Sequence, residues 1–257
     1  MLYKVDSLKK TYSKEKQSII KEGTFNLNNS EIYAILGKSG SGKTTLLNIL
    51  ASLDRPDSGN IRMHIDHLFN KQNFSDEKVS NSIELLKNEI KKNNDDFFEL
   101  YEQNEKIKNK IRLYCFGFIF QCFHLVPQLT ALENVKMPLI FAGFSKKKQN
   151  EIAEEKLKYV DIIDRKDHKP NELSGGEKQR VAIARALVLE PNVIFADEPT
   201  GNLDFITTDK ILKIFSNIHN DNKRTIIIVT HDIDILKELQ CKRYLMNNNG
   251  IIKEDLF

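Results

Sequence analysis

Cysteine is scarce in this sequence, and long apolar runs are absent. The three cysteines, Cys115, Cys122 and Cys241, are odd in number and scattered, which favours free thiols in a reducing compartment over a disulfide framework. No stretch approaches the roughly 20 consecutive apolar residues that a membrane-spanning helix needs. Residues 1–6 carry neither the basic segment nor the apolar core of an export signal. We therefore expect the protein to stay in the cytosol.

The sequence also has no large excess of basic over acidic residues, or of acidic over basic ones. The 39 Lys and Arg nearly balance the 36 Asp and Glu, which leaves a formal net charge of +3. The longest basic run, Lys146–Lys148, is better explained as the start of a surface helix. Because nucleic-acid binding normally needs a basic patch or stripe, we expect no nucleic-acid partner.

The chain does contain enough apolar material for one sizeable core. Of its 257 residues, 40% are hydrophobic, and strand-like segments alternate with helix-like ones. Such alternation predicts an α/β domain, in which helices cover a sheet that is largely parallel.

The strongest single motif is a phosphate-binding loop. Residues 37–44 fit G-x-x-x-x-G-K-[ST] between an apolar strand-like segment and a helix-like one, flanks that an incidental Gly/Ser turn would not explain. Glycines let backbone N–H groups approach a triphosphate, and the following helix adds the positive end of its dipole. We expect Lys43 to reach the β- and γ-phosphates and the hydroxyl of Thr44 to bind Mg²⁺. The predicted nucleotide-binding residues here are Gly37, Lys38, Ser39, Gly40, Ser41, Gly42, Lys43, Thr44 and Thr45.

Four polar residues that end apolar, strand-like segments complete a candidate hydrolysis site. We expect Asp197 to hold Mg²⁺ and the adjacent Glu198 to polarise the attacking water. Gln121 is a candidate contact to both metal and water, and His231 a candidate donor to the γ-phosphate. Each of the last two alone is more often a surface residue, so the prediction depends on the combination.

A second anion-binding feature lies at residues 173–180, which read Leu-Ser-Gly-Gly-Glu-Lys-Gln-Arg. Ser174 and two glycines precede a helix-like segment, 177–189, and a helix N-terminus attracts anions. The chain thus has two anion sites but one pair of metal-binding carboxylates.

Taken together, these motifs resemble the nucleotide-binding subunits of ATP-binding cassette (ABC) transporters, in the family's order and over nearly the whole chain. The resemblance implies a single domain, 1–257, of class α/β. Its parts would be a P-loop NTPase core with a mixed or parallel sheet, an antiparallel β subdomain and an α-helical signature subdomain at about 122–190. It also implies hydrolysis of ATP with Mg²⁺ by two such domains, identical or closely related, packed head to tail.

The same resemblance assigns roles that the motifs alone do not. Asp204, the last residue of a Gly-Asn-Leu-Asp run, would lie at the seam between the two domains. Tyr12 matches the aromatic residue that stacks on adenine, and a surface tyrosine after a strand is the alternative. Ser174, Gly175 and Gly176 would contact the γ-phosphate that the other domain holds, and Glu177 belongs to the same in-trans signature.

Residues 53–56, 123–135 and 137–143 resemble one subfamily, the ABC ATPases of lipoprotein release, macrolide export, antimicrobial-peptide detoxification and division-site signalling. There, an integral-membrane permease is worked mechanically. The resemblance therefore implies a permease partner and a peripheral position on the cytoplasmic face of the membrane. A soluble ABC ATPase without a transport role, such as a cytosolic assembly factor, is the alternative.

The chain departs from that subfamily between Gly59 and Gln121, where it carries roughly 25 to 30 additional residues, as surface loops tolerate. The extra material, about 70–112, is polar, but its apolar residues follow a 3-and-4 spacing that predicts helix, and residues 91–96 predict a break into a hairpin. A projection that contacts a partner is one interpretation, and a solvated insert is the one that we favour. The spaced residues are Ile83, Leu86, Ile90, Phe97, Leu100, Ile107 and Ile111.

Overall fold

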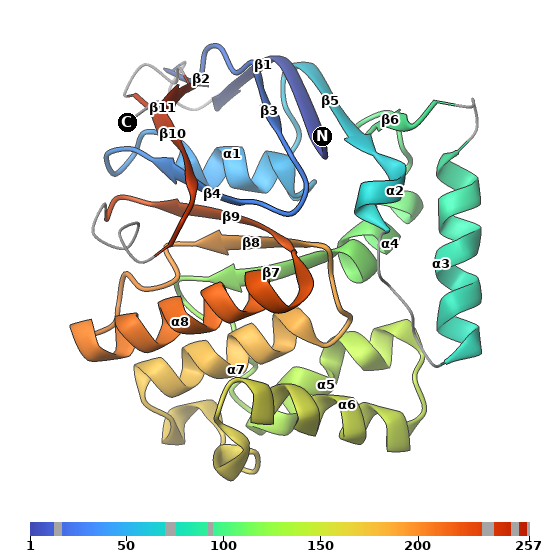
Figure 1. The fold of residues 1–257 in the computed structure, drawn as a ribbon, viewed down its shortest axis with the longest axis vertical. Coiled ribbons are helices and arrows are strands. Elements are labelled where there is room, and N and C mark those ends of the chain that lie inside the picture. The colour runs from blue at the N-terminus through green and yellow to red at the C-terminus, as the bar shows by residue number, and fades with distance from the viewer. Residues whose placement is uncertain (13–16, 70–75, 92–94, 233–238, 248–251, 256–257) are drawn as a thin grey trace.

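The computed structural model describes residues 1–12, 17–69, 76–91, 95–232, 239–247 and 252–255 (Figure 1). Its centre is a six-stranded sheet in the order β11-β10-β4-β9-β8-β7. Neighbouring strands in it run parallel, except that β10 and β11 are antiparallel. The strands are β4 (Ile32–Leu36), β7 (Phe116–Phe120), β8 (Val193–Asp197), β9 (Thr225–Thr230), β10 (Lys242–Met246) and β11 (Ile252–Asp255).

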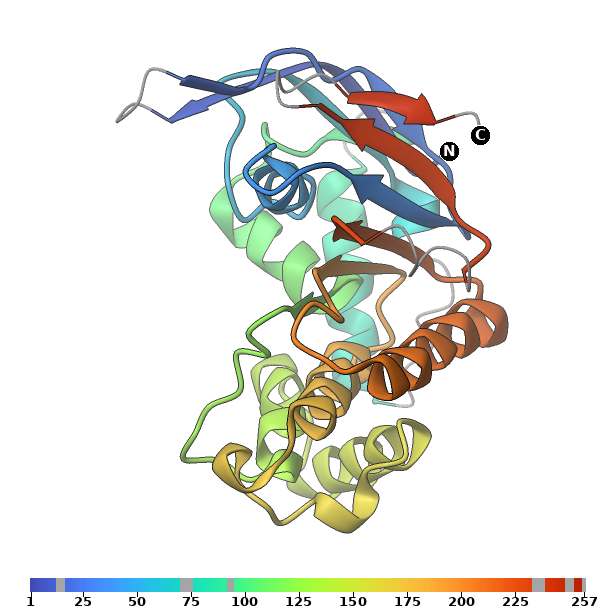
Figure 2. The same cartoon turned by 90° about the vertical axis from the view of Figure 1, so that its left-hand side faces the viewer.

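Burial on both faces explains the unbroken apolar sequences of the central strands. Every residue of β4 and β9 is buried, as are the first four residues of β8. Parallel strands are covered on both faces by their crossover helices, so alternation with polar residues is not needed. Because β4, β8 and β9 run in the same direction, the residues that follow them meet at one edge of the sheet. That edge is on the left in Figure 1 and faces the viewer in Figure 2.

A second, antiparallel sheet has the order β2-β1-β5-β6, with β3 also paired to β1. Helix α1 (Lys43–Leu50) lies between the two sheets (Figure 2), and its apolar side chains are buried there. The predicted class, α/β with a mixed sheet, an antiparallel β part and a helical part, is therefore confirmed. The antiparallel strands are β1 (Tyr3–Tyr12), β2 (Gln17–Ile20), β3 (Phe25–Leu27), β5 (Ser58–His64) and β6 (Phe97–Glu99).

Helices α5 to α7 form a layer at the opposite end of the molecule from the antiparallel sheet, where α7 packs against β7 and α8 lies beside α7 (Figures 1 and 2). Thr130, Ser145 and Ser174 start α5, α6 and α7, because each side-chain oxygen accepts a backbone N–H of the first turn. As expected, the basic run at Lys146 begins a helix. Within the described ranges, no helix combines the length and the apolarity needed to cross a bilayer. The elements are α5 (Ala131–Ala142), α6 (Lys146–Tyr159), α7 (Gly175–Leu187), α8 (Phe205–Asn222) and the 3-10 turns η1 (Ile163–Arg165) and η2 (Pro170–Glu172).

The region expected to be a helical insertion is in part a β-hairpin. Strands β5 and β6 are antiparallel partners, with Arg62 opposite Glu99, so the chain between them is the connection of a hairpin. This connection contains α2 (Ile65–Leu68) and α3 (Glu77–Ile90). The predicted continuation of helix through Phe97 is wrong, because two consecutive phenylalanines favour a strand and pairing with β5 overrides the apolar spacing.

Two polar residues in this region start helices. The side chain of Asp76 accepts the N–H of Val79 at the start of α3. The side chain of Asn104 likewise accepts the N–H of Ile107, at 2.9 Å, where α4 (Glu105–Cys115) begins. The apolar face of α3, formed by Val79, Ile83, Leu86 and Ile90, is 0–7% exposed. The favoured interpretation, a solvated insert, is therefore wrong for residues 77–90, which pack into the domain.

The far end of the phosphate-loop helix is held by Tyr101, which precedes α4, and by Arg112, which lies within α4. The Oη of Tyr101 lies 2.5 Å from the carbonyl oxygen of Ile49 and 2.6 Å from that of Asp54. Arg112 donates to the carbonyl oxygen of Ser52 at 2.5 Å. The backbone N–H of Ser52 also donates to the carbonyl oxygen of Ile49, so the two side chains add hydrogen bonds to a helix end that is already capped.

Replacing Tyr101 by Phe is expected to lower the free energy of unfolding by about 1 kcal/mol, because the hydroxyl that bonds to the carbonyl oxygens of Ile49 and Asp54 is lost. Urea denaturation of the two proteins measures the difference. Tyr159 is the matched control, because its hydroxyl contacts Asp221 near the surface and the residue is 40% exposed. Equal effects of Tyr101→Phe and Tyr159→Phe would contradict the role of Tyr101 at the end of α1.

Candidate active site

The phosphate-binding loop connects β4 to α1 and is shaped by its glycines. Gly40 and Gly42 have φ angles of 78° and 97°, in the left-handed region that disfavours other residues. A Cβ on Gly37 would lie 2.4 Å from the carbonyl oxygen of Met246, and one on Gly42 would lie 2.4 Å from Cγ2 of Ile19. A Cβ on Gly40 would meet nothing within 4 Å. The loop is thus packed against its own domain on one side and open on the other, as a triphosphate requires.

Lys43, the first residue of α1, points back into this loop. Its Nζ donates to the carbonyl oxygens of Gly37, at 2.9 Å, and Lys38, at 3.1 Å, and the side chain is 7% exposed. The same Nζ lies 3.9 Å from Oε1 of Glu198. The loop therefore holds a buried ammonium group between its own carbonyls and the predicted catalytic carboxylate.

Thr44 and Asp197 are brought together from two elements, α1 and β8. The hydroxyl of Thr44 donates to Oδ1 of Asp197 at 2.9 Å. Burial raises the pKa of Asp197, and the neighbouring charge of Glu198 raises it further. A divalent cation would favour the ionised form of Asp197, and hydroxyl and carboxylate oxygens are ligands that Mg²⁺ accepts. These residues therefore fit Mg²⁺.

The loop also fits a phosphate ligand. The hydroxyl of Ser41 is buried and has no hydrogen-bond partner among the residues that the structure describes. Buried hydroxyls are nearly always paired. An oxygen atom of a phosphate held in the loop would provide the missing partner.

Glu198 is held in a fixed position by three contacts from β9 and its end. Its backbone N–H donates to the carbonyl oxygen of Val229 at 2.9 Å. Its side chain accepts the hydroxyl of Thr230 at 3.1 Å and lies 2.9 Å from Nδ1 of His231. The φ angle of Glu198 is 45°, in the left-handed region, where a residue other than Gly stays only if its surroundings hold it there. These contacts, together with the rotamer preferences of the side chain, fix the orientation of the Glu198 carboxylate.

Thr230 is a site residue that the sequence analysis did not identify. It is fully buried, and its hydroxyl also accepts the N–H of Asp232. A threonine that ends a buried strand beside a predicted active-site histidine was the available signal. Its contact with Glu198 links positions 32 apart in the sequence, which no local pattern reveals.

Gln121 follows β7 and lies beside the loop after Glu198. Its Nε2 is 3.1 Å from the position of a Cβ built on Gly201, and its backbone carbonyl oxygen accepts the side-chain amide of Asn202 at 3.4 Å. Tyr12 ends β1, but its side chain is outside the described part of the structure. Contacts of Gln121 with metal and of Tyr12 with adenine both stay predictions.

The signature residues 174–177 begin α7 with a capping box. The N–H of Glu177 donates to the hydroxyl of Ser174 at 3.3 Å, and the N–H of Ser174 donates to the carboxylate of Glu177 at 2.8 Å. This backbone hydrogen bond from Ser174 lowers the pKa of Glu177, and Arg165 adds an ion pair at 3.1 Å. Glu177 is therefore an anionic helix cap in the free chain.

The turn before α8 packs against this signature. A Cβ on Gly176 would lie 2.3 Å from Cγ2 of Thr207, and one on Gly175 would lie 3.4 Å from Leu203. Asp204 caps α8 by accepting both the N–H and the hydroxyl of Thr207, at 3.0 and 2.7 Å. The signature and Asp204 therefore share one surface. Among the described residues, no hydrogen bond or ion pair joins residues 174–177 to the phosphate-binding loop.

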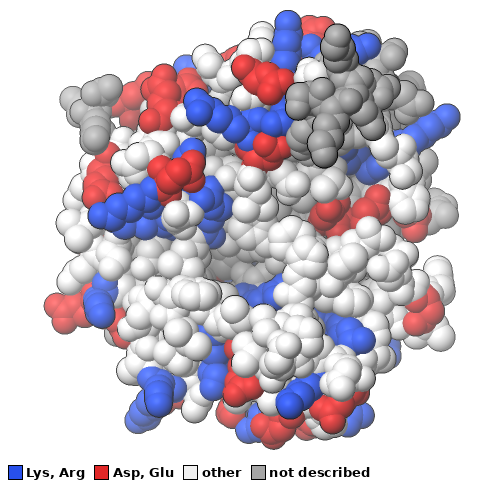
Figure 3. Space-filling model, turned by 180° about the vertical axis from the view of Figure 1, so that it is seen from behind, with Lys and Arg blue, Asp and Glu red and all other residues white. Residues whose placement is uncertain are grey.

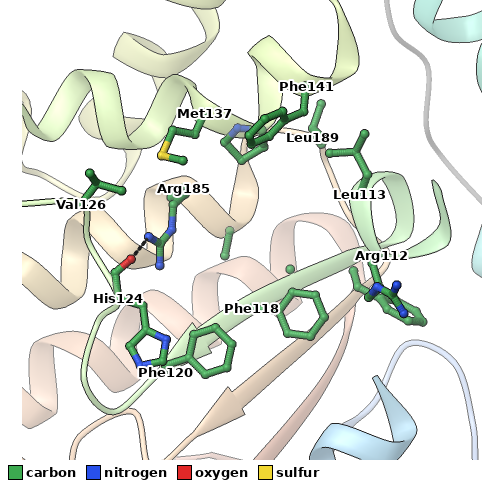
Figure 4. A pocket seen from close by; sticks show the side chains of 14 residues that line it. Arg112, Leu113, Phe118, Phe120, His124, Val126, Met137, Phe141, Arg185 and Leu189 are labelled. Carbon is green, nitrogen blue, oxygen red and sulfur yellow. Dashed lines mark hydrogen bonds between the residues drawn. The ribbon is translucent and has the colours of Figure 1, made fainter. Parts of the chain in front are cut away.

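A groove of about 340 Å³ lies between the helical layer and β7 (Figure 4). Arg185, on α7, crosses it and donates to the carbonyl oxygens of Phe123 and His124, both of which have left-handed φ angles of 59° and 48°. Aromatic rings form much of its wall, with Phe120 stacked on His124 and Phe141 opposite. Seen from behind (Figure 3), the molecule is hollowed near its middle, and uncharged side chains border most of the hollow.

Comparison with known proteins identifies the family. The sequence matches the family described as ABC transporter over residues 20–201, more than half of the chain. It is 38% identical to the lipoprotein-releasing system ATP-binding protein LolD of Bacteroides thetaiotaomicron, over 92% of this chain and 93% of that protein. It is 39% identical to the macrolide export ATP-binding/permease protein MacB of Chlorobium phaeobacteroides, over 89% of this chain but 30% of that longer protein.

A solved structure agrees in fold over almost the whole chain. The dimeric structure of MJ0796, an ABC transporter cassette of Methanocaldococcus jannaschii, has a TM-score of 0.78 and 33% identity, covering 99% of this chain and 98% of that one. The same cassette has also been solved as a dimer in a post-hydrolysis state with ADP and Pi. The chain therefore belongs to the ABC transporter family, as an ATP-hydrolysing subunit related to the ATP-binding proteins named for lipoprotein release and macrolide export.

Proposed function

We propose that this subunit hydrolyses Mg²⁺-bound ATP in a site shared between two copies, and that the resulting opening and closing drive a permease from the cytoplasmic face of a membrane. One observation carries the hydrolytic part of the proposal. Around Glu198, the structure gathers the ammonium of Lys43, the hydroxyl of Thr230 and the imidazole of His231, with Thr44 and Asp197 paired beside them.

Each of these groups has a task that its contacts support. The side chain of Glu198 is held by Thr230 and His231, so its carboxylate is placed to orient a water molecule and accept its proton. Lys43 offers positive charge where the phosphate-binding loop opens, and Thr44 with Asp197 would hold the metal. Mg²⁺ would neutralise charge on the phosphates when bound. Because phosphoryl transfer depends mainly on positioning and charge, a preorganised site of this kind suffices.

The proposal of a shared site rests on the separation of the signature from the phosphate-binding loop within one copy. The signature at the start of α7 and the phosphate-binding loop are both suited to anions, yet no hydrogen bond or ion pair connects them within the described chain. The structural relative MJ0796 has been solved as a dimer. In a head-to-tail pair, residues 174–177 of one copy would close the site on the loop of the other.

The permease part of the proposal is supported by the relatives' names and by the groove beside Arg185. LolD is named for a lipoprotein-releasing system, and MacB for macrolide export by a combined ATP-binding and permease protein. The groove presents Phe141, which is 71% exposed, next to the half-buried Met137. An apolar side chain from a permease helix is the occupant that such a groove fits.

Replacing Phe141 by Asp is expected to reduce co-purification of the permease about tenfold, because it places a charge where the partner's apolar side chain must be buried. The measurement compares the two tagged proteins after detergent extraction of membranes, with multi-span proteins identified by mass spectrometry. Leu85→Asp is the matched control, since Leu85 is 62% exposed but lies on α3, outside the groove.

The outcomes separate the two candidate functions. Recovery of one multi-span protein with the parent and with Leu85→Asp, but not with Phe141→Asp, supports a transport or mechanical role. Recovery of soluble partners alone would instead support a cytosolic assembly ATPase. Equal recovery of a permease with Phe141→Asp would leave the transport role standing and remove the groove as its docking site.

A further inference from the structure

Two large apolar residues, Phe205 and Ile206, are exposed to solvent at the first two positions of α8. Phe205 is 88% exposed and Ile206 is 69% exposed. Helix formation does not account for them, because the first turn of a helix favours acidic side chains and α8 has none there. Neighbouring apolar residues of this exposure indicate a surface that another molecule covers.

Their position is fixed by the turn that precedes them. Both carboxylate oxygens of Asp204 are used in capping α8, through the N–H and the hydroxyl of Thr207. Thr207 in turn packs against Gly176 of the signature. The apolar pair therefore lies on the same surface as the signature, at the edge of the molecule that faces the viewer in Figure 2.

We propose that Phe205 and Ile206 form an apolar anchor, which a second copy of this chain covers when two copies close around nucleotide. The inference rests on the shared site proposed above. It adds that burial of the apolar pair contributes to dimer affinity, in addition to the contribution of the nucleotide. The pair is continuous with the surface that carries the signature and Asp204, which is the surface that a second copy must approach to complete the site.

The groove proposed for the permease does not include this pair. The groove proposed for the permease is lined from α4, β7, α5 and α7, and none of its lining residues comes from α8. A two-fold dimer uses each surface twice, so both copies would bury the pair and each substitution acts twice on the dissociation constant. The anchor would thus make dimer closure sensitive to two residues that touch neither phosphate nor metal.

The experiment uses the full chain with Glu198→Gln, a background in which bound ATP is expected to persist. Sedimentation over a range of protein concentrations with Mg²⁺ and ATP gives the dimer dissociation constant. Adding Phe205→Ser with Ile206→Ser is expected to raise this constant at least about tenfold. Binding of a fluorescent ATP analogue to the dilute monomer and the melting temperature are expected to stay unchanged, because both side chains are exposed.

Two further variants make the result specific. Phe141→Ser removes a comparably exposed phenylalanine from the groove and is expected to leave the dimer constant unchanged. Phe205→Leu with Ile206→Val keeps the surface apolar and is expected to dimerise within about threefold of the background. This conservative pair also supplies the test should the serine variant melt at a lower temperature: a tenfold loss in the conservative pair would overturn the anchor.

The failures of the two proposals are distinguishable. If the serine variant dimerises as tightly as its background, the anchor is refuted while the shared site stands. An equal loss with Phe141→Ser would also refute it, because the effect would then follow from apolar surface in general. If the background itself stays monomeric with Mg²⁺ and ATP at all concentrations, the shared site itself is refuted.

Discussion

Replacing Glu198 by Gln is expected to slow ATP hydrolysis by about 100-fold or more, since general-base catalysis typically contributes that much. Glutamine has nearly the shape of glutamate, so the left-handed backbone at this position and its N–H bond to Val229 are kept. What is lost is the oxygen that can take a proton from water. ATP affinity is expected to change by less than about threefold, because binding and chemistry use different groups.

Steady-state phosphate release measures the loss, and isothermal titration with ATP measures the affinity. Glu84→Gln is the matched control, because Glu84 is an exposed residue of α3 far along the chain from the site. Sedimentation with Mg²⁺ and ATP should show the Glu198→Gln protein as a dimer, since closure is not followed by hydrolysis. A variant that hydrolysed ATP at the normal rate would remove Glu198 from the catalytic role.

The site was predictable wherever its residues are adjacent in sequence. The phosphate-binding loop, the signature, and the pair Asp197 and Glu198 are contiguous, so their spacing alone carries the chemistry. The restraints on Glu198 were not predictable, because Thr230 and His231 reach it from the neighbouring strand. Parallel pairing of β8 with β9 creates that contact, and its register is visible only in three dimensions.

At residues 65–115, too, the local features were predictable from the sequence and the pairing of distant segments was not. The caps at Asp76 and Asn104 are local, and the helices that they begin were expected. The strand at 97–99 was missed, because its hydrogen-bonding partner is β5, far back along the chain. A 3-and-4 apolar spacing records which side chains are buried, but a short strand beside a helix can bury side chains at the same intervals.

Replacing Lys43 by Ala is expected to weaken ATP binding about 100-fold, because hydrogen bonds to a charged group contribute about 1.5–3 kcal/mol each. The ammonium group is 7% exposed and sits among the carbonyl oxygens of Gly37 and Lys38. Removing it leaves the loop with no ammonium group, so phosphate is then attracted by its N–H groups, the helix dipole, the Ser41 hydroxyl and bound Mg²⁺. This variant therefore loses binding, whereas Glu198→Gln loses the chemical step.

Comparing the two variants at an ATP concentration that saturates Glu198→Gln but not Lys43→Ala separates these losses. Lys43→Ala should stay monomeric at ATP concentrations that convert Glu198→Gln to a dimer, because closure requires bound nucleotide. Lys147→Ala, which removes an exposed lysine from α6, controls for the change in net charge. Normal ATP affinity in Lys43→Ala would mean that the backbone of the loop is sufficient, and the 3.9 Å approach of Lys43 to Glu198 would then have to serve the folded structure rather than the nucleotide.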